Sequence, residues 1–597
     1  MKLNPNRAGR RTLTTAVGCA TLLVGLTAIS APPVQATVLC AVQYQRASWP
    51  GGMSVNIVLG NVGDTWTGWT LRFAFPDVGE RIAQGWSATW TQRGRDVTVT
   101  NMPWNGTVTS GGTAVMGFNG TWTTSAAAPV SFSVNGVACT RPGTTTTTVS
   151  STTTTRTTTR TTPTTTRTTT TTTTTTPPTT GHVDNPYAGA RAYVNPDWSA
   201  KAAADGGSAV AGQPTAVWLD SVAAVTAEPG SGYPTSLRGH LDNALAQGAG
   251  LVQVVIYDLP GRNCGRLWSD GELFPTELDR YRNDFIDPIA SIEADPRYAS
   301  LRIVNIIEPD SLVNLITSVS YGNERCVEVQ SDGTYLLGVR YALDALHAAG
   351  PNVYTYVDVA NHSWFGWETN FAAAATLFAQ VAKDTAGGVN SVDGFVTNTA
   401  NYAPTTEPYF TIDTMVGGVS VRRSRWVEWN NYVDELTFAQ AFRRQLVANG
   451  FDPSVGMLLD TSRNGWGGSL RPKGPSISND VDTFVDESRI DRRIHAGDWC
   501  NQAGAGLGAR PVADPAPGID AYVWIKPPGE SDGSSALIPI GVDNPMGKGF
   551  DRMCDPDYGG NYRNGNNPSG ALADAPPAGA WFSAQFHELL ANAYPPL

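Results

Sequence analysis

The sequence predicts a multidomain chain in which an all-β sandwich precedes an α/β, TIM-like barrel. With 597 residues the chain is too long for a single hydrophobic core. Residues 40–139 hold short β-rich runs separated by Gly and Asn turns, without a helical period. From residue 185 onward, strand-like and helix-like segments alternate, which is the pattern of a parallel sheet covered by helices.

The first residues are typical of an export signal. Positive charges, an apolar stretch and a small-residue cleavage site follow one another at residues 2–11, 16–29 and 34–36. The apolar stretch is too short and too rich in Ala and Thr for a membrane span. We expect residues 1–36 to be a signal peptide and the protein to be secreted into the extracellular space; a retained anchor is the alternative.

The composition points away from nucleic acid and towards carbohydrate. A formal net charge of -11, without a basic stripe interleaved with aromatic residues, argues against a nucleic-acid partner. The chain has 18 Trp and 19 Tyr, whose rings stack well on sugar rings. Most Trp in proteins lie in cores, so this count is only a hint.

Residues 37–140 are predicted to form the sandwich, with strands at residues 54–59, 69–75, 96–100, 114–118 and 130–134. Trp49 and Trp104 stand beside Pro and Gly or Asn turn residues, where a large ring is expected to be exposed. Folding of these rings back into the core is the alternative. Trp69 lies in an alternating strand and is predicted to be core.

This stretch resembles a carbohydrate-binding module of family 2 from end to end. The matching residues are Cys40, Tyr44, Trp49, residues 68–71, 85–86, 101–106, 117–118 and 135–136, and Cys139. The resemblance implies that Trp49, Trp86 and Trp104 lie in a row on a flat face that docks on crystalline cellulose.

Residues 141–182 are nearly all Thr with scattered Arg and Pro. Such a segment cannot bury enough apolar surface to offset ordering, so we expect a disordered linker. Fully extended at about 3 Å per residue, it would separate its neighbours by on the order of 100 Å. The Thr and Pro content of a secreted chain also suggests O-glycosylation.

Residues 183–597 are predicted to form the barrel domain. Its expected strands are residues 216–220, 251–258, 301–307, 353–359, 394–397, 455–460 and 521–525. Its expected helices are residues 236–247, 276–293, 335–348, 371–383 and 581–591. No Gly-rich nucleotide turn follows the first strand, which favours a barrel over an open sheet.

The chain is organised around residues 306–312, where an apolar strand ends. Pro309 cannot extend the strand, so Asp310 should lie at its carboxyl end. Apolar surroundings would raise the pKa of this carboxyl group, which suits a general acid. An N-cap for the next helix is the alternative. Three more strands end in polar or aromatic residues, as in a barrel active site, at residues 255–260, 356–358 and 522–527.

Residues 185–597 resemble glycoside hydrolase family 6, the cellobiohydrolases and endoglucanases with a distorted α/β barrel. The matching stretches are residues 217–220, 257–264, 269–272, 307–312, 364–367, 397–402, 497–501 and 524–533. The resemblance implies hydrolysis with inversion of configuration, which needs room for water between two carboxyl groups. It implies no metal and no cofactor.

The resemblance also implies residue roles. Asp310 would protonate the leaving oxygen, Asp532 would be the general base, Tyr257 would press on the sugar at the cleavage point, and Ser269 would hold the attacking water. The sugar subsites would be lined by Trp218, Asp220, Trp364, Asn401, Trp524, Lys526 and Glu530.

Two positions depart from the family pattern. Asn263 stands where the family has an Asp that is thought to raise the pKa of the acid, and Asn cannot ionise. We therefore predict an active enzyme with a lower basic pH limit, in which Asp258 and Asp270 are candidates to substitute in part. Asn361 takes the place of a family His, and the following His362 is expected to make a structural hydrogen bond.

Six cysteines remain once Cys19 leaves with the signal, and an even number in an exported protein suggests disulfides. The natural pairing within domain limits is Cys40 with Cys139, Cys264 with Cys326, and Cys500 with Cys554. No Cys-x-x-Cys or paired-His spacing occurs, so a metal site is not expected.

Two long loop-like stretches, residues 463–493 and 534–552, bear on the mode of action, because long loops are usually functional. Folded over the cleft, they favour a cellobiohydrolase that releases cellobiose from non-reducing ends. An endoglucanase is the alternative, and a non-catalytic cellulose-binding protein is the remote one. Cellulose and cello-oligosaccharides are the expected partners of a monomer, with no nucleic acid and no membrane.

Overall fold

The computed structural model describes residues 39–49, 52–102, 105–109, 112–123, 128–139, 182–266, 271–320, 323–538 and 550–597. The chain divides into two compact units, Met1–Thr164 and Thr165–Leu597. The predicted signal peptide and residues 141–181 of the predicted linker lie outside the described residues. Within the described ranges, no helix combines the length and the apolar character needed to cross a membrane.

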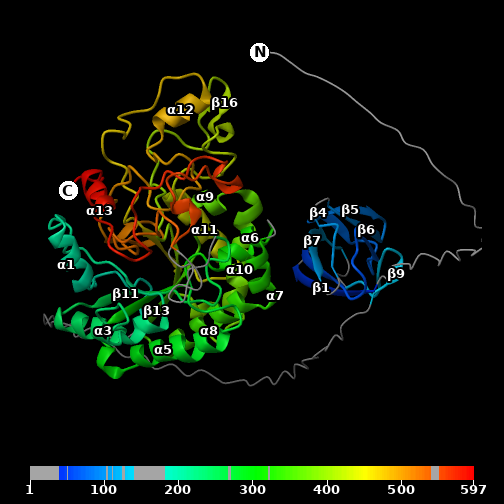
Figure 1. The fold of residues 1–597 in the computed structure, drawn as a ribbon, viewed down its shortest axis with the longest axis horizontal. Coiled ribbons are helices and arrows are strands. Elements are labelled where there is room, and N and C mark those ends of the chain that lie inside the picture. The colour runs from blue at the N-terminus through cyan, green and yellow to red at the C-terminus, as the bar shows by residue number, and fades with distance from the viewer. Residues whose placement is uncertain are drawn as a thin grey trace, which may run out of the picture. The chain divides into compact units, whose positions relative to one another are not determined.

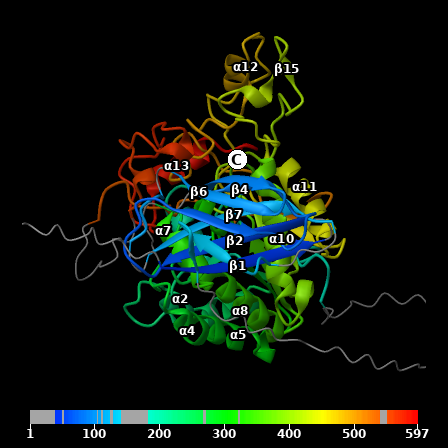
Figure 2. The same ribbon diagram turned by 90° about the vertical axis from the view of Figure 1, so that its right-hand side faces the viewer.

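The first unit contains two antiparallel sheets. One has the order β1 (Cys40–Trp49), β2 (Gly52–Asn61), β7 (Thr113–Thr121), β4 (Arg81–Trp86), and Figure 2 shows these strands side by side. The other has the order β5 (Ala88–Arg93), β6 (Asp96–Asn101), β3 (Thr70–Ala74), β8 (Phe132–Val134), β9 (Val137–Ala138).

Side chains from both sheets share one core. Ile57 of β2, Phe118 of β7 and Leu71 of β3 are all fully buried in it. Trp69 is 1% exposed and its indole N–H donates to the Asn105 carbonyl oxygen, so its prediction as a core residue is confirmed. Strand β5 was missed because it is an edge strand that buries little apolar surface.

The second unit is built on one eight-stranded sheet. Its order is β10 (Val217–Leu219), β11 (Leu251–Ile256), β12 (Arg302–Ile307), β13 (Val353–Asp358), β14 (Gly394–Thr397), β17 (Gly456–Asp460), β19 (Ile519–Val523), β18 (Val512–Ala516). The first seven are parallel to one another, and each lies where a strand was predicted. Only β18 is antiparallel, at the edge beside β19.

Helices join and cover these strands (Figure 1). The larger ones are α1 (Pro196–Ala204), α3 (Leu237–Ala246), α5 (Asp287–Glu293), α7 (Glu324–Ser331), α8 (Thr334–Ala349), α10 (Glu368–Lys383), α11 (Glu435–Ala448), α12 (Val481–Ser488) and α13 (Ser583–Ala591). The helix predicted over residues 276–293 forms as α4 (Leu278–Arg280), a π-helical turn η1 (Tyr281–Ile286) and α5.

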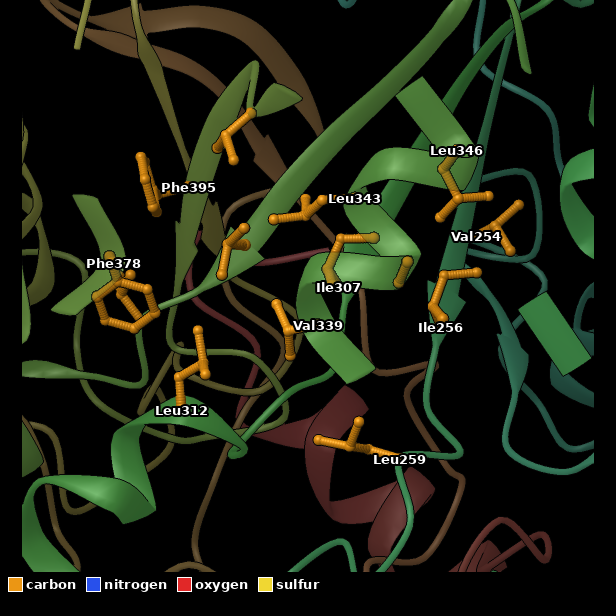
Figure 3. Close-up of a cluster of buried hydrophobic side chains, with 14 of the residues drawn as sticks. Val254, Ile256, Leu259, Ile307, Leu312, Val339, Leu343, Leu346, Phe378 and Phe395 are labelled. Carbon is orange, nitrogen blue, oxygen red and sulfur yellow. The ribbon is translucent and has the colours of Figure 1, made fainter. Parts of the chain in front are cut away.

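The strands are buried on both faces, as their continuous apolar runs predicted. Val254 and Ile256 of β11 face the covering helices and join a cluster with Leu343 of α8, which Figure 3 shows. Val255, between them, points to the other face and packs in a second cluster with Ile306. Alternate side chains of each strand therefore hold two different cores.

The parallel part of the sheet curls so that its two ends meet. The Ala216 N–H, just before β10, donates to the Trp524 carbonyl oxygen just after β19 at 3.1 Å. The Trp218 indole donates to the next carbonyl oxygen, that of Ile525, at 2.9 Å. The curled sheet carries the carboxyl ends of its strands on one rim.

Three disulfides pair the six cysteines as predicted: Cys40 with Cys139, Cys264 with Cys326, and Cys500 with Cys554. In the second unit, the Cys264–Cys326 bond ties the loop after β11 to α7. The bonds span 62 and 54 residues there, so each removes substantial freedom from the unfolded chain.

The insertion at residues 463–493 was predicted to lack structure, and that prediction was wrong. It contains α12, whose Phe484 and Val485 pack against Phe410 and Val421 in a small separate core. Figure 1 shows α12 beside β16 (Val419–Ser420). The partners come from residues 409–433, a different insertion, so no local pattern in 463–493 indicated this packing.

Leu343 tests the packing of α8 on the sheet. It is fully buried, whereas Leu337 on the same helix is 42% exposed. Leu343→Ala should lower the free energy of unfolding of the second unit by about 2–5 kcal/mol, because it leaves a cavity. Leu337→Ala should change it by about 0.5 kcal/mol or less. Urea unfolding followed by far-UV circular dichroism measures both, and equal effects would contradict this account of the core.

Candidate active site

Polar side chains from several strands gather at the carboxyl rim of the curled sheet. Tyr257 directly follows β11, Asp310 stands three residues after β12, and Asp358 ends β13. Lys526 stands three residues after β19. Parallel strands deliver their carboxyl ends to one side, so these groups lie on the same rim of the sheet.

A buried carboxylate, Glu308, joins the ends of β11 and β12. It accepts hydrogen bonds from the backbone N–H groups of Asp258 at 3.2 Å and Leu259 at 3.1 Å, and from the Tyr281 hydroxyl at 2.8 Å. Burial raises the pKa of Glu308 to about 7, although these three donors oppose the shift. Glu308 thus continues the pairing of the two strands beyond their last residues.

Asp310 is held beside one cation and one carboxyl group. Its side chain is 26% exposed, and its Oδ2 accepts from Arg266 Nη2 at 3.1 Å. Its backbone N–H donates to Asp358 Oδ1 at 3.1 Å. The short 3-10 helix that follows, Leu312–Leu315, has Ser311 at its N-cap position, so the alternative of Asp310 as a helix cap is wrong.

Asp358 is the buried partner of Asp310. Its Oδ1 also accepts from the Ala360 N–H at 3.1 Å. Burial, and then the charge of Asp310, raise the pKa of Asp358 to about 7. Asp258, suggested as a substitute for the missing family carboxylate, instead lies 3.6 Å from Arg262 Nη1. Asp270, the other suggested substitute, lies outside the described residues.

Asn263 is buried against the Tyr257 hydroxyl. It is 1% exposed, and its Nδ2 donates to the Tyr257 hydroxyl at 2.7 Å. The Tyr257 ring also stacks under the Arg262 guanidinium at 4.3 Å and meets Trp218 edge to face at 5.3 Å. A change at position 263 therefore acts on Tyr257 directly.

Asp532 is ionised and heavily hydrogen-bonded. Its Oδ2 accepts from Arg463 Nη1 and the Tyr402 hydroxyl, each at 2.8 Å, and from the Asn501 N–H at 2.9 Å. Burial disfavours its charge, but Arg463, Lys526 and the hydrogen bonds outweigh burial and lower the pKa of Asp532. A carboxylate stabilised in this way accepts a proton reluctantly, so it is a weak general base.

Several predicted sugar-lining residues lie close to this cluster. The Lys526 ammonium donates to the Ser531 carbonyl oxygen at 3.0 Å and lies 5.5 Å from the Trp218 ring centroid. Asp220 accepts from the Tyr233 hydroxyl at 2.5 Å. Burial raises the pKa of Glu530.

Trp524 differs from the other predicted sugar-lining residues. Its side chain is 0% exposed, it packs edge to face on Trp198, and its indole donates to the Ala509 carbonyl oxygen. A ring that is buried in a core cannot stack on a sugar, so the prediction for Trp524 is wrong. Trp364 is partly exposed, with its indole donating to the Thr317 hydroxyl at 2.8 Å.

His362 makes a structural hydrogen bond, as predicted. It is 5% exposed, with Nδ1 2.6 Å from Glu435 Oε1, and its backbone N–H donates to the same oxygen. Its neighbour Asn361 accepts from the Ser363 hydroxyl at 2.6 Å. These contacts hold the start of the short helix α9 (His362–Phe365).

Some predicted residues fall outside what the structure describes. Ser269 and Trp104 lie outside the described residues, as do the side chains of Trp49 and Trp86. Trp49 and Trp86 stand at the ends of β1 and β4. The proposed row of tryptophans and the water-holding serine therefore stay predictions.

Comparison with known proteins assigns the two units to families. Residues 178–593 match the profile of the Glycosyl hydrolases family 6, and residues 40–139 match the Cellulose binding domain. The chain belongs to glycosyl hydrolase family 6. Among curated family 6 proteins, Exoglucanase A of Cellulomonas fimi is 49% identical over 438 residues. The match covers 69% of this chain and 49% of that protein, so the chain spans about half the length of this relative.

Other family 6 proteins agree with this assignment. Exoglucanase 3 of Agaricus bisporus is 34% identical, with 69% of this chain and 80% of that protein covered. The solved catalytic domain of Cellulomonas fimi Cel6B is 47% identical with a TM-score of 0.66, covering 70% of this chain and 97% of that one. The CcCel6A catalytic domain, solved with p-nitrophenyl β-D-cellotrioside, is 31% identical with a TM-score of 0.53, and the match covers 69% of this chain and 99% of that one.

Four charged residues that shape the site were not predicted from the sequence: Arg266, Glu308, Asp358 as the partner of Asp310, and Arg463. Glu308 lies inside the predicted site stretch, residues 306–312, so its position next to the strand end was a signal for its role. Arg463 lies 69 residues from its partner Asp532, and nothing local connects the two.

Arg266 should tune the pH range of the family 6 reaction. Its positive charge 3.1 Å from Asp310 favours the ionised carboxylate, which is the inactive form of a general acid. Arg266→Gln should therefore move the basic limb of kcat/KM to higher pH. Cellotetraose hydrolysis across pH measures this shift. Arg340→Gln, which removes a surface pair with Asp384, is the control and should leave the limb in place.

Proposed function

We propose that the protein is a secreted cellulase that hydrolyses the β-1,4-glucosidic bonds of cellulose with inversion. We further propose exo action, as a cellobiohydrolase that releases cellobiose from non-reducing ends. The observation that carries the proposal is a family 6 chain with Asp310 at the carboxyl end of β12, hydrogen-bonded through its backbone to the buried Asp358 carboxyl.

Asp310 is the proposed general acid. Its carboxyl group is partly exposed, so it can reach a bound glycosidic oxygen and give it a proton as the bond breaks. The Asp358 carboxyl, whose pKa is raised by burial and by Asp310, helps this pair to keep a proton towards neutral pH.

Water completes the reaction on the opposite side of the sugar ring. Asp532 is the proposed general base, and Ser269 the proposed holder of the water. As the general base, Asp532 would take a proton from the water as the water attacks the sugar carbon, while Asp310 gives its proton to the departing oxygen. The ion pair with Arg463 holds the Asp532 carboxylate in place and makes it a weak base.

The remaining site residues are proposed to bind the glucan. Tyr257, fixed by Asn263 and Arg262, would press on the sugar at the cleavage point. The proposed subsite residues are Trp218, Asp220, Trp364, Asn401, Lys526 and Glu530. Tryptophan faces stack on sugar rings, and the polar groups match hydroxyls, so this set suits a cello-oligosaccharide.

The first unit is proposed to be a β-sandwich that docks on crystalline cellulose through Trp49, Trp86 and Trp104. Residues 141–182 would tether it to a distorted TIM-like barrel, and residues 1–36 would direct the chain out of the cell. Docking keeps a monomeric enzyme at an insoluble substrate, and this raises the effective concentration of chain ends. Support comes from the match to the Cellulose binding domain.

Endo action is the second candidate within the family. The relatives named exoglucanase favour exo action, and the products distinguish the two. An exo enzyme yields mainly soluble cellobiose from swollen cellulose with little loss of carboxymethylcellulose viscosity, whereas an endo enzyme reduces the viscosity early. Release of no sugar at all would leave only cellulose binding.

Asp310→Ala tests the proposed acid. Loss of a general acid should lower kcat on cellotetraose by about 10²- to 10⁴-fold while the protein stays folded. Asp279→Ala is the matched control, since the Asp279 side chain is 90% exposed on α4, and it should keep the parent rate. Hydrolysis by a folded Asp310→Ala protein at the parent rate would end the proposal.

Asn263→Asp tests the departure from the family pattern. An aspartate there would add negative charge at the turn that carries Arg266, whose backbone N–H donates to the carbonyl oxygen of residue 263 and whose guanidinium contacts Asp310. A like charge near Asp310 would favour its protonated form. The basic limb of kcat/KM should therefore move to higher pH than in the parent. The exposed Asn390→Asp is the control. Identical basic limbs for the parent and Asn263→Asp would count against a pH role for position 263.

A further inference from the structure

Asn401 sits between two residues that contact Asp532 or its arginine partner. The carbonyl oxygen of Ala400 accepts a hydrogen bond from Arg463, and the hydroxyl of Tyr402 donates to Asp532. Asn401 itself is partly exposed. Its amide group therefore lies at the edge of the site with one side towards protein.

The orientation of the Asn401 amide is determined by two donors. Its Oδ1 accepts from the Tyr402 backbone N–H at 2.7 Å and from Arg493 Nη1 at 3.0 Å. An NH₂ group cannot accept either bond, so the oxygen must occupy this side. The NH₂ group then points elsewhere, and within the described part of the chain it makes no hydrogen bond.

Arg493 is itself held rigidly. Its side chain is 0% exposed, its Nη2 donates to Asp491 Oδ2 at 2.6 Å, and its Nε lies 3.1 Å from both carboxylate oxygens of Asp491. Its Nη1 also donates to the Asp498 carbonyl oxygen at 2.9 Å. The two-pronged pairing fixes the plane of the guanidinium, so Nη1 reaches Asn401 in one geometry.

The end of the 463–493 insertion is hydrogen-bonded to another loop close to the Arg493–Asp491 ion pair. The Ile490 N–H donates to Glu407 Oε2 at 2.9 Å, and the Glu407 N–H donates to Asp434. A buried ion pair is weak evidence for stability, because removing two charges from water costs as much as their attraction returns. Because the Arg493–Asp491 pair contacts Asn401, its role is to orient the Asn401 side chain.

We infer that Arg493 and Asp491 are positioning residues that set the amide of Asn401, so that Asn401 offers an N–H donor to an oxygen of the bound glucan. This rests on the proposed function and extends it. An N–H donor selects a hydroxyl or ring oxygen that presents a lone pair, and it rejects a group that can only donate. The insertion thereby contributes to sugar recognition without touching the sugar.

The test is a double-mutant cycle on cellotetraose hydrolysis. Arg493→Gln combined with Asp491→Asn removes the ion pair without leaving a buried charge, and it should lower kcat/KM about tenfold or more, mainly through a higher KM. In an Asn401→Ala background the same pair of changes should lower kcat/KM less than about twofold, because the positioned group is gone. Arg492→Gln, at the neighbouring and less buried arginine, is the control with parent kinetics.

Equal losses in the two backgrounds would overturn the inference, as would parent kinetics in a folded Arg493→Gln–Asp491→Asn protein. Asn401→Asp is a second variant that should fold, because its carboxylate still accepts from Arg493. It should weaken cellotetraose binding in calorimetry about tenfold, since it loses the donor, and unchanged affinity would also overturn the inference. A parent protein that binds cellotetraose but does not hydrolyse it would contradict the proposed function and would leave the inferred role of Arg493 and Asp491 in binding open to the calorimetric test.

Discussion

The buried carboxylate of Glu308 is the interaction on which the arrangement of the site depends. It accepts from the backbone N–H groups of Asp258 and Leu259 and from the Tyr281 hydroxyl. Strand pairing ends at Ile307, and without this carboxylate two buried N–H groups would lose their acceptor. Glu308 thus gives the loop that holds Tyr257 and the turn that holds Asp310 a common frame.

Asp460 is a second buried carboxylate that accepts hydrogen bonds from backbone N–H groups of loops at this rim. At the end of β17, its two oxygens accept from the N–H groups of Ala400, Ser462, Ile525 and Lys526. The loops after β14 and β19 are therefore fixed to β17, as the loops after β11 and β12 are fixed to each other. Acceptors that replace missing strand partners keep the loops in place, and such rigidity is what a catalytic constellation requires.

Two charged groups contact Asp310, the proposed acid. The guanidinium of Arg266 donates to its carboxylate, and its own backbone N–H donates to the buried Asp358 carboxyl group. The charge of Arg266 favours the ionised form of Asp310, whereas a negative charge on Asp358 favours the protonated form. In the proposed mechanism, the balance of these two groups sets the pH up to which Asp310 keeps its proton.

The sequence alone predicted a two-domain architecture, the seven parallel strands, the three disulfides and the position of Asp310 after β12. Apolar runs, turn residues and the number and positions of cysteines are signals that can be read along the chain without the fold. The sequence could not place Arg463 on Asp532, or Arg493 on Asn401, since these partners lie 69 and 92 residues apart. The prediction that Trp524 lines the cleft was wrong, because the burial of a ring depends on which distant residues pack against it. Here Trp198 packs on the Trp524 ring. The local sequence specified which residues stand at the end of each strand. Only the tertiary structure decided which distant residues contact and orient them, because those contacts form only after the sheet has curled and the insertions have packed.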